Sequence, residues 1–290
     1  MPIVGKRADL IILDDVVTLM FPDIPTNLLY GKKPMNKFAP VAPIHIYEAL
    51  ANRGYMPDNI LLLAHDVVKP ENQERYESLF HGKWASTHVI MDNSLIELKG
   101  AVDLSMIKEA VNIVAADVVV LPDSLTDGLE SAWLTTKSLD QFKTVFDPMN
   151  VELLAVIQGE TEKGFFGALE LMAEQIDPDW VSIPRRTEAK FGYSRSELIP
   201  FVDMFFSDKK LHLLGFSEYP WEDIKAAQHS RVTSIDSAAP LRSKMPFSDP
   251  GEPRVNGGVD WWDTVTFDMD ILHRIYKVDA LINGTYVTGE

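Results

Sequence analysis

The stretch Val118-Val119-Val120-Leu121-Pro122-Asp123 is a short apolar run that ends at an acid. Apolar residues that follow one another without alternation indicate a strand buried on both faces, as in a parallel sheet. Similar runs, each stopping near a polar residue, occupy residues 9–14, 60–66, 88–92, 153–158, 180–184, 211–215 and 232–236. The pattern therefore predicts eight parallel strands.

Helical patterns separate these runs. Residues 103–115 place Leu104, Ile107, Val111 and Val114 on one face, behind Asp103 as the expected N-cap. Similar helices are expected over 163–175 and 194–207, from Pro220 onward, and as a closing helix from Trp261 to Tyr276.

Strands that alternate with helices predict an α/β protein, a single (β/α)₈ TIM barrel over residues 1–290. Residues 15–59 are expected to form an extended first β/α connection, and residues 241–290 a C-terminal loop and helix. A doubly wound open sheet is the alternative fold. No Gly-x-Gly-x-x-Gly motif follows any predicted strand, which disfavours dinucleotide binding.

The composition narrows the class of protein. Hydrophobic residues make up 46% and charged residues 24% of the 290 residues, and there is no cysteine. These values are typical of a soluble globular protein, and the lack of cysteine fits a reducing compartment. No apolar run is long enough to cross a bilayer and no signal peptide is visible, so a cytoplasmic location is expected. The net charge of −16 argues against a broad nucleic-acid-binding surface.

Catalytic groups of TIM barrels lie at the C-terminal ends of the strands. In this sequence those positions hold His65, Asp66, Asp92, Asp123, Gln158, Arg185, Arg186 and Asp236. Several acids in one cleft raise each other's pKa, so such a cluster indicates a function. Aspartate is also a favoured helix N-cap, which is the alternative for each one. No motif such as His-Glu-x-x-His is present, so a metal site is not expected.

Five blocks of the sequence resemble the tRNA-guanine transglycosylase (queuine tRNA-ribosyltransferase) family. The segment from Ser234 to Arg242 resembles the family's Phe-Asp-Cys-Val-x-Pro-Thr-Arg, with Asp, Pro and Arg in the same spacing. Residues 213–224 resemble Leu-Met-Gly-Val-Gly-x-Pro-Glu-Asp-Leu, and residues 155–159 resemble Gly-Ile-Val-Gln-Gly. Asp92 begins a segment placed like the family's Asp-Ser-Gly-Gly-Phe-Gln, and Asp123 stands where the family has a base-reading aspartate. The blocks keep the family's order over about residues 60–242.

The departures from the family also carry information. The tRNA enzymes hold zinc with three cysteines and a histidine, and this chain has no cysteine to form that subdomain. Ser94-Leu95 replaces a double glycine, and Ile183-Pro184-Arg185-Arg186 does not match the family's glycine-rich segment. The missing zinc site and the short length make the chain most similar to the zinc-less DNA-guanine transglycosylases of phages, which would place it in a host cytoplasm.

The resemblance implies a base exchange without metal or organic cofactor. Asp236 would attack C1′ of a guanine nucleotide and form a covalent intermediate, and Asp92 would act as the acid and base. The remaining substrate-binding residues would be Asp123, Gln158, Gly159, Gly215, His65 and Asn93. The incoming base would be a 7-deazaguanine such as preQ0, with the cyano, formamidino, aminomethyl and amido forms all open.

The implied partner is DNA, with tRNA as an alternative and an accessory protein as an open possibility. A base in a duplex is out of reach of Asp236, so the target nucleotide must be flipped out or single-stranded. Phosphate contacts are expected from the basic residues after the sixth and eighth strands, Arg185, Arg186, Lys190, Arg195, Arg242 and Lys244. Phe191 and Tyr193 could stack on bases. A nucleoside or glycoside hydrolase, or a non-catalytic binding protein, would also fit the barrel.

Overall fold

The computed structural model describes residues 11–13, 16–18, 37–98, 100, 103–125, 127–185, 192–216, 221–242 and 261–284. The chain divides into two compact units, Met1–Met35 and Asn36–Glu290. In the first unit, β1 (Ile11–Leu13) pairs antiparallel with β2 (Val16–Thr18), with Ile12 opposite Val17.

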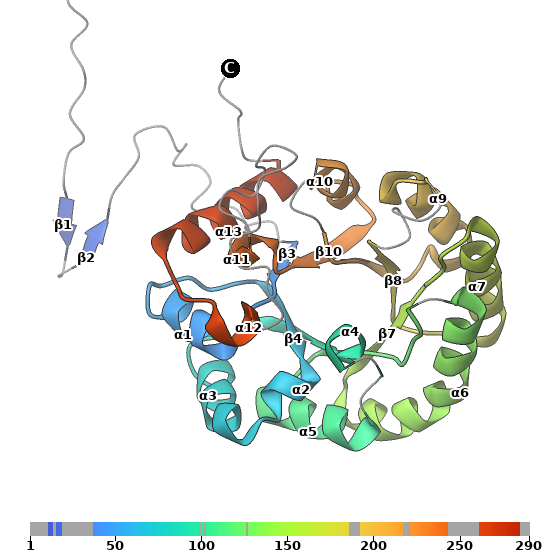
Figure 1. Cartoon of the computed structure of the whole chain (residues 1–290), viewed down its shortest axis with the longest axis horizontal. Coiled ribbons are helices and arrows are strands. Elements are labelled where there is room, and N and C mark those ends of the chain that lie inside the picture. The colour runs from blue at the N-terminus through green and yellow to red at the C-terminus, as the bar shows by residue number, and fades with distance from the viewer. Residues whose placement is uncertain are drawn as a thin grey trace, which may run out of the picture. The chain divides into compact units, whose positions relative to one another are not determined.

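The second unit holds a sheet of eight strands in the order β3-β10-β9-β8-β7-β6-β5-β4. Every neighbouring pair in this order is parallel. The strands are β3 (Phe38–Pro40), β4 (Asn59–Leu63), β5 (His88–Asp92), β6 (Val118–Val120), β7 (Glu152–Val156), β8 (Trp180–Pro184), β9 (Lys210–Leu214) and β10 (Val232–Ser237). The sheet curls into a nearly closed barrel surrounded by helices (Figure 1). The predicted (β/α)₈ barrel is confirmed.

Helices follow the strands in alternation. They are α1 (Ile44–Ala51), α2 (Ala64–Val67), α3 (Pro70–Phe80), α4 (Leu95–Leu98), α5 (Leu104–Val114), α6 (Gly128–Phe146), η2 (Asp147–Met149), α7 (Glu162–Gln175), α9 (Arg195–Phe206), α10 (Trp221–Ala227), α11 (Ala239–Arg242), α12 (Trp261–Thr264) and α13 (Met269–Ile282). The predicted cap of α5 is confirmed, since Asp103 accepts a hydrogen bond from the Met106 N–H.

The strands bury both of their faces, as their continuous apolar runs predict. One core cluster contains only residues of the strands and the positions just after them, among them Leu61, Ile90, Val118, Leu154 and Trp180, and it fills the barrel interior. The other cluster combines alternate strand residues with helix residues and lies between the sheet and the helices. This double burial makes the barrel a rigid frame for side chains at its rim.

Tyr47 joins the two strands at the ends of the hydrogen-bonded order. Its hydroxyl lies 3.1 Å from the Pro40 carbonyl oxygen of β3 and 3.2 Å from the Leu61 carbonyl oxygen of β4. The same oxygen accepts a hydrogen bond from the Ala42 N–H at 2.8 Å. A buried side chain of α1 thus satisfies backbone groups where β3 and β4 meet, and helps to close the barrel.

The prediction for the first barrel strand was wrong. Residues 11–13 pair with β2, and the barrel begins at Phe38, inside the segment expected to be a long connection. Strand β3 has three residues and ends in a proline, which cannot donate a ladder hydrogen bond. It is therefore too short and too atypical to be predicted from a run of apolar residues. Its parallel register with β10 places Ala39 opposite Asp236.

The expected closing helix from Trp261 to Tyr276 is two helices. Helix α12 ends at Thr264, and α13 begins after Asp268, whose side chain accepts the N–H of Ile271 at 2.8 Å. Between them, the Val265 carbonyl oxygen lies 2.7 Å from Nε2 of His45, and the Val265 side chain is buried. A new N-cap and a buried anchor therefore break the helix.

Candidate active site

A cavity of about 480 Å³ opens at the C-terminal ends of the barrel strands. Most of the predicted site residues line it: Asp92, Asn93, Asp123, Gln158, Arg185, Gly215, Asp236 and Arg242. Apolar side chains, including Leu61, Leu63, Val156 and Phe216, form much of the remaining wall. A cavity with apolar walls and a few convergent polar groups is typical of a small-molecule site.

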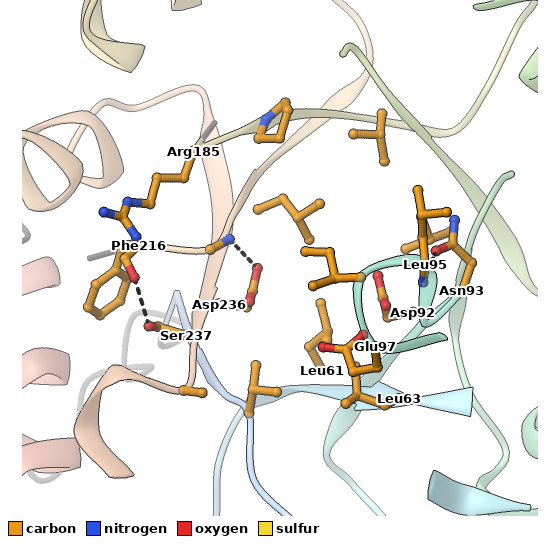
Figure 2. Close-up of a pocket in the computed structure, with 18 of the residues that line it drawn as sticks. Leu61, Leu63, Asp92, Asn93, Leu95, Glu97, Arg185, Phe216, Asp236 and Ser237 are labelled. Atoms are coloured by element: carbon orange, nitrogen blue, oxygen red, sulfur yellow. Dashed lines mark hydrogen bonds between the residues drawn. The ribbon is translucent and has the colours of Figure 1, made fainter. Parts of the chain in front are cut away.

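Asp236, near the end of β10, is held by two groups. Its Oδ1 accepts the Gly215 N–H at 2.7 Å (Figure 2). The same oxygen lies 3.0 Å from Nε2 of His212. Gly215 has a φ of +70°, a conformation that glycine adopts without a steric penalty. Among the described residues, none donates to Oδ2, so this oxygen is left to engage a ligand in the cavity.

His212 on β9 contacts Asp236 on the neighbouring strand β10. The link to Asp236 was not predicted. His212 is fully buried on β9, and its Nδ1 lies 2.7 Å from Oγ of Ser234 on β10. Part of this link could have been predicted from the sequence. Side chains alternate along a strand, so Ser234 and Asp236 point to the same face of β10.

Asp92 ends β5 on the other side of the cavity from Asp236 (Figure 2). Its Oδ2 accepts the Ser94 N–H at 2.8 Å, in a turn where Ser94 has a φ of +57°. Desolvation and the negative charge of Glu97 raise the pKa of Asp92 well above its ordinary value, against the opposing effect of the Ser94 hydrogen bond. A raised pKa favours the protonated form of the carboxyl group, which is the form that a general acid needs.

Glu97 is a site residue that the sequence prediction missed. It lies on α4, lines the cavity and stands beside Asp92 in Figure 2. Desolvation, and to a smaller extent the charge of Asp236, raise the pKa of Glu97 above its ordinary value. The short helix after Asp92 carries it into the cavity, and no strand-end rule points to a residue five positions further along.

Asn93, Asp123 and Gln158 form a hydrogen-bonded array along neighbouring strand ends. Nδ2 of Asn93 donates to Oδ1 of Asp123 at 2.8 Å, and Nε2 of Gln158 donates to Oδ2 at 2.7 Å. Burial raises the pKa of Asp123, and these two hydrogen bonds oppose the rise. All three side chains are buried and line the cavity. Amides and a carboxylate in a fixed array suit the edge of a heterocyclic base.

Three predicted residues have other positions. Gly159 packs under α7, where a Cβ atom would lie 2.5 Å from the Phe165 backbone nitrogen. His65 is half-buried on α2, and like Gly159 it is not among the described residues that line the cavity. Arg195 does not reach the rim: it is buried, ion-paired with Asp223, and within reach of the Ile183 and Leu214 carbonyl oxygens.

Two of the basic residues predicted to contact phosphates line the cavity. Arg185 is exposed at the end of β8 and Arg242 ends α11, and both line the cavity. Arg186, Lys190, Phe191 and Lys244 lie outside the described residues. Tyr193 is exposed to an intermediate degree, with its hydroxyl 3.2 Å from Glu162 and its ring against Phe166.

Asp66, which the sequence placed at a strand end, has a structural position. It is buried on α2, where its carboxylate accepts hydrogen bonds from Tyr76 and Asn72 and pairs with Lys69. Among the described residues, no group of three or more His, Asp or Glu side chains is arranged to hold a metal ion. No helix in the described part of the chain has the length and apolar character needed to cross a membrane.

Comparisons with known proteins leave the family open. No protein-family model matches the chain, and no curated protein matches its sequence.

Proposed function

We propose that the protein is a base-exchange transglycosylase that replaces guanine in DNA with a 7-deazaguanine. The observation that carries this proposal is the pairing of carboxyl groups in one cavity: Asp236 with Oδ1 held and Oδ2 available, facing Asp92 with its raised pKa. A pair of carboxyl groups would fit several reactions. Both residues lie in the blocks that resemble guanine transglycosylases, and this resemblance favours base exchange.

In the first step, Oδ2 of Asp236 bonds to C1′ of the target nucleotide as the C1′–N9 bond breaks. Guanine leaves with the bonding electron pair and takes the proton of Asp92. A carboxylate suits this step, because it stabilises an oxocarbenium-like transition state and forms a reversible ester. The leaving base lies in reach of the Asn93–Asp123–Gln158 array, which would bind its polar edge.

In the second step, the 7-deazaguanine gives its N9 proton to Asp92, and N9 attacks C1′ while the ester to Asp236 breaks. Two displacements at C1′ restore the original configuration. The cavity of about 480 Å³ lies within the range for small-molecule sites, so a flipped-out nucleobase is a suitable occupant. Arg185 and Arg242 line the same cavity and would contact the phosphates of a nucleotide bound there.

The test is incubation of the pure protein with guanine-containing DNA, or with tRNA in parallel, and a mass-tagged 7-deazaguanine in each of its four forms. The proposal predicts incorporation into DNA by the wild type and none by Asp236→Asn. Glu174→Gln, on the exposed face of α7, serves as the control and should incorporate the base normally.

Other outcomes would correct the proposal. Incorporation into tRNA alone would keep the chemistry and change the substrate. Release of guanine without incorporation would indicate a hydrolase, in which water resolves the intermediate. No reaction with any base or nucleic acid, with or without cell extract to supply a partner, would contradict the transglycosylase function.

A further inference from the structure

Three buried polar side chains lie next to one another inside the barrel, below the cavity. Ser182 on β8, His212 on β9 and Ser234 on β10 pair in register across neighbouring strands, and each is fully buried. The core cluster around them is made of residues such as Ile90, Val118 and Leu154. TIM-barrel interiors are normally filled with branched apolar side chains, so a buried histidine here needs a specific reason.

The hydrogen bonds of His212 supply that reason. Both ring nitrogens have partners, Nε2 with Oδ1 of Asp236 at 3.0 Å and Nδ1 with Oγ of Ser234 at 2.7 Å. An ionised carboxylate can only accept, so Nε2 carries the proton. If the ring is neutral, Nδ1 is the acceptor, and the Ser234 hydroxyl donates to it. By contrast, Oγ of Ser182 has no hydrogen-bond partner among the described residues, although it flanks the same histidine.

We infer that His212 is a positioning residue for Asp236, with Ser234 fixing its tautomer. This inference rests on the proposed function, in which Asp236 is the nucleophile. His212 does not line the cavity, so it acts through Asp236 and not on the substrate.

The geometry explains how the histidine positions the carboxylate. Oδ1 is held by the backbone N–H of Gly215 and by the ring of His212, which come from different parts of β9 and the turn that follows it. Two donors on one oxygen restrict rotation about the Cβ–Cγ bond and keep Oδ2 directed to the cavity. A reacting group held in this way by residues behind it loses less entropy on reaching the transition state.

The kinetic test compares His212→Leu, His212→Gln and Ser234→Ala in single-turnover formation of the covalent intermediate. His212→Leu removes the donor, and the rate should fall by about 10- to 100-fold, as for the loss of a hydrogen bond to a charged group. The KM for the 7-deazaguanine should change by less than about 2-fold, because the base does not contact His212. His212→Gln, whose amide can supply a donor to Oδ1, should restore most of the rate. Ser234→Ala should lie between the two.

Two matched controls separate this role from packing. His88→Leu removes another strand histidine, which is half-buried at the start of β5, and Ser182→Ala removes the other serine beside His212. Neither touches Asp236, so both should keep the wild-type rate even where thermal stability changes. A rate of His212→Leu equal to that of His88→Leu, relative to the wild type, would overturn the inference.

A spectroscopic test decides the inference even if no base exchange occurs. Nitrogen-15 spectra of the histidine-labelled wild type should show His212 as the neutral Nε2–H tautomer, and Asp236→Asn should shift its Nε2 signal. The carbon-13 signal of the Asp236 carboxyl should move in His212→Leu and stay in place in His88→Leu. An Nδ1–H tautomer, or an Asp236 signal that ignores His212, would overturn the positioning role whatever the reaction proves to be.

Discussion

At the residue scale, the two sides of the cavity differ in what holds their carboxyl groups. Both accept a backbone N–H, but Asp236 also lies beside a histidine, whereas Asp92 is surrounded by other acids. Environments that differ in this way allow one carboxyl group to act as a nucleophile and the other as an acid. The distinction depends on neighbours that only the folded chain brings together.

Glu97 should set the pH range of the proposed reaction. Its negative charge is the second cause, after desolvation, of the raised pKa of Asp92. An acid must be protonated to donate, so activity should fall as pH rises through that pKa. Glu97→Gln removes the charge, lowers the pKa of Asp92, and should move this alkaline fall to lower pH in a profile of kcat/KM.

The control for this experiment is Glu174→Gln, which removes a charge of the same sign from the exposed face of α7. Its profile should overlay that of the wild type. A profile of Glu97→Gln that is unchanged, or displaced to higher pH, would contradict the coupling between Glu97 and Asp92.

Most of the candidate site could be predicted residue by residue, because strand ends of a barrel meet at one rim. Asp92, Asp123, Gln158 and Asp236 all follow that rule. The prediction failed for Arg195, because the sequence alone does not show that Arg195 forms a buried ion pair with Asp223 and so does not reach the rim. Its ion pair instead ties α9 to α10.

At the scale of the elements, the short strand β3 is the part that sequence reasoning placed wrongly. Seven of the eight strands in the barrel order coincide with predicted apolar runs, and β3 does not. A strand of three residues has too few positions to show a hydropathy pattern of its own. Its place in the barrel depends on its partners: β3 pairs in register with β10, and Tyr47 links it to β4.

Tyr47→Phe should therefore destabilise the barrel. The change removes a buried hydroxyl that accepts the Ala42 N–H and lies within hydrogen-bonding distance of carbonyl oxygens of β3 and β4. Loss of these bonds should lower the free energy of unfolding by about 1–3 kcal/mol in urea denaturation.

Tyr55→Phe provides the matched comparison. The Tyr55 hydroxyl is also buried, but within the described part of the chain it has no hydrogen-bond partner. Its removal should leave stability unchanged or slightly higher. Equal losses for the two variants would show that the Tyr47 hydroxyl does not support the closure of the barrel.

At the scale of the whole molecule, the charge conflicts with the proposed partner. A net charge of −16 repels DNA, while the exposed Arg185 and the α11 residue Arg242 supply positive charge at the cavity. The sequence predicted both features. The sequence did not show which basic residues reach the rim. In the structure Arg195 is buried, whereas Arg185 is exposed.

Arg185→Ala should weaken DNA binding at low salt. If Arg185 contacts one phosphate, the slope of log Kd against log salt concentration should decrease by about 1. Fluorescence anisotropy with a labelled duplex at several salt concentrations measures this. Lys108→Ala, on the exposed face of α5, should leave the slope unchanged. An unchanged slope for Arg185→Ala would exclude Arg185 from the DNA contact.

The most direct test of the central claim is intact-protein mass spectrometry after brief incubation with a guanine-containing oligonucleotide and no incoming base. We expect a covalent adduct with the mass of the oligonucleotide minus guanine, mapped by peptide sequencing to Asp236, and its loss on addition of a 7-deazaguanine. An adduct on another residue, or free guanine without any adduct in the wild type, would contradict Asp236 as the nucleophile.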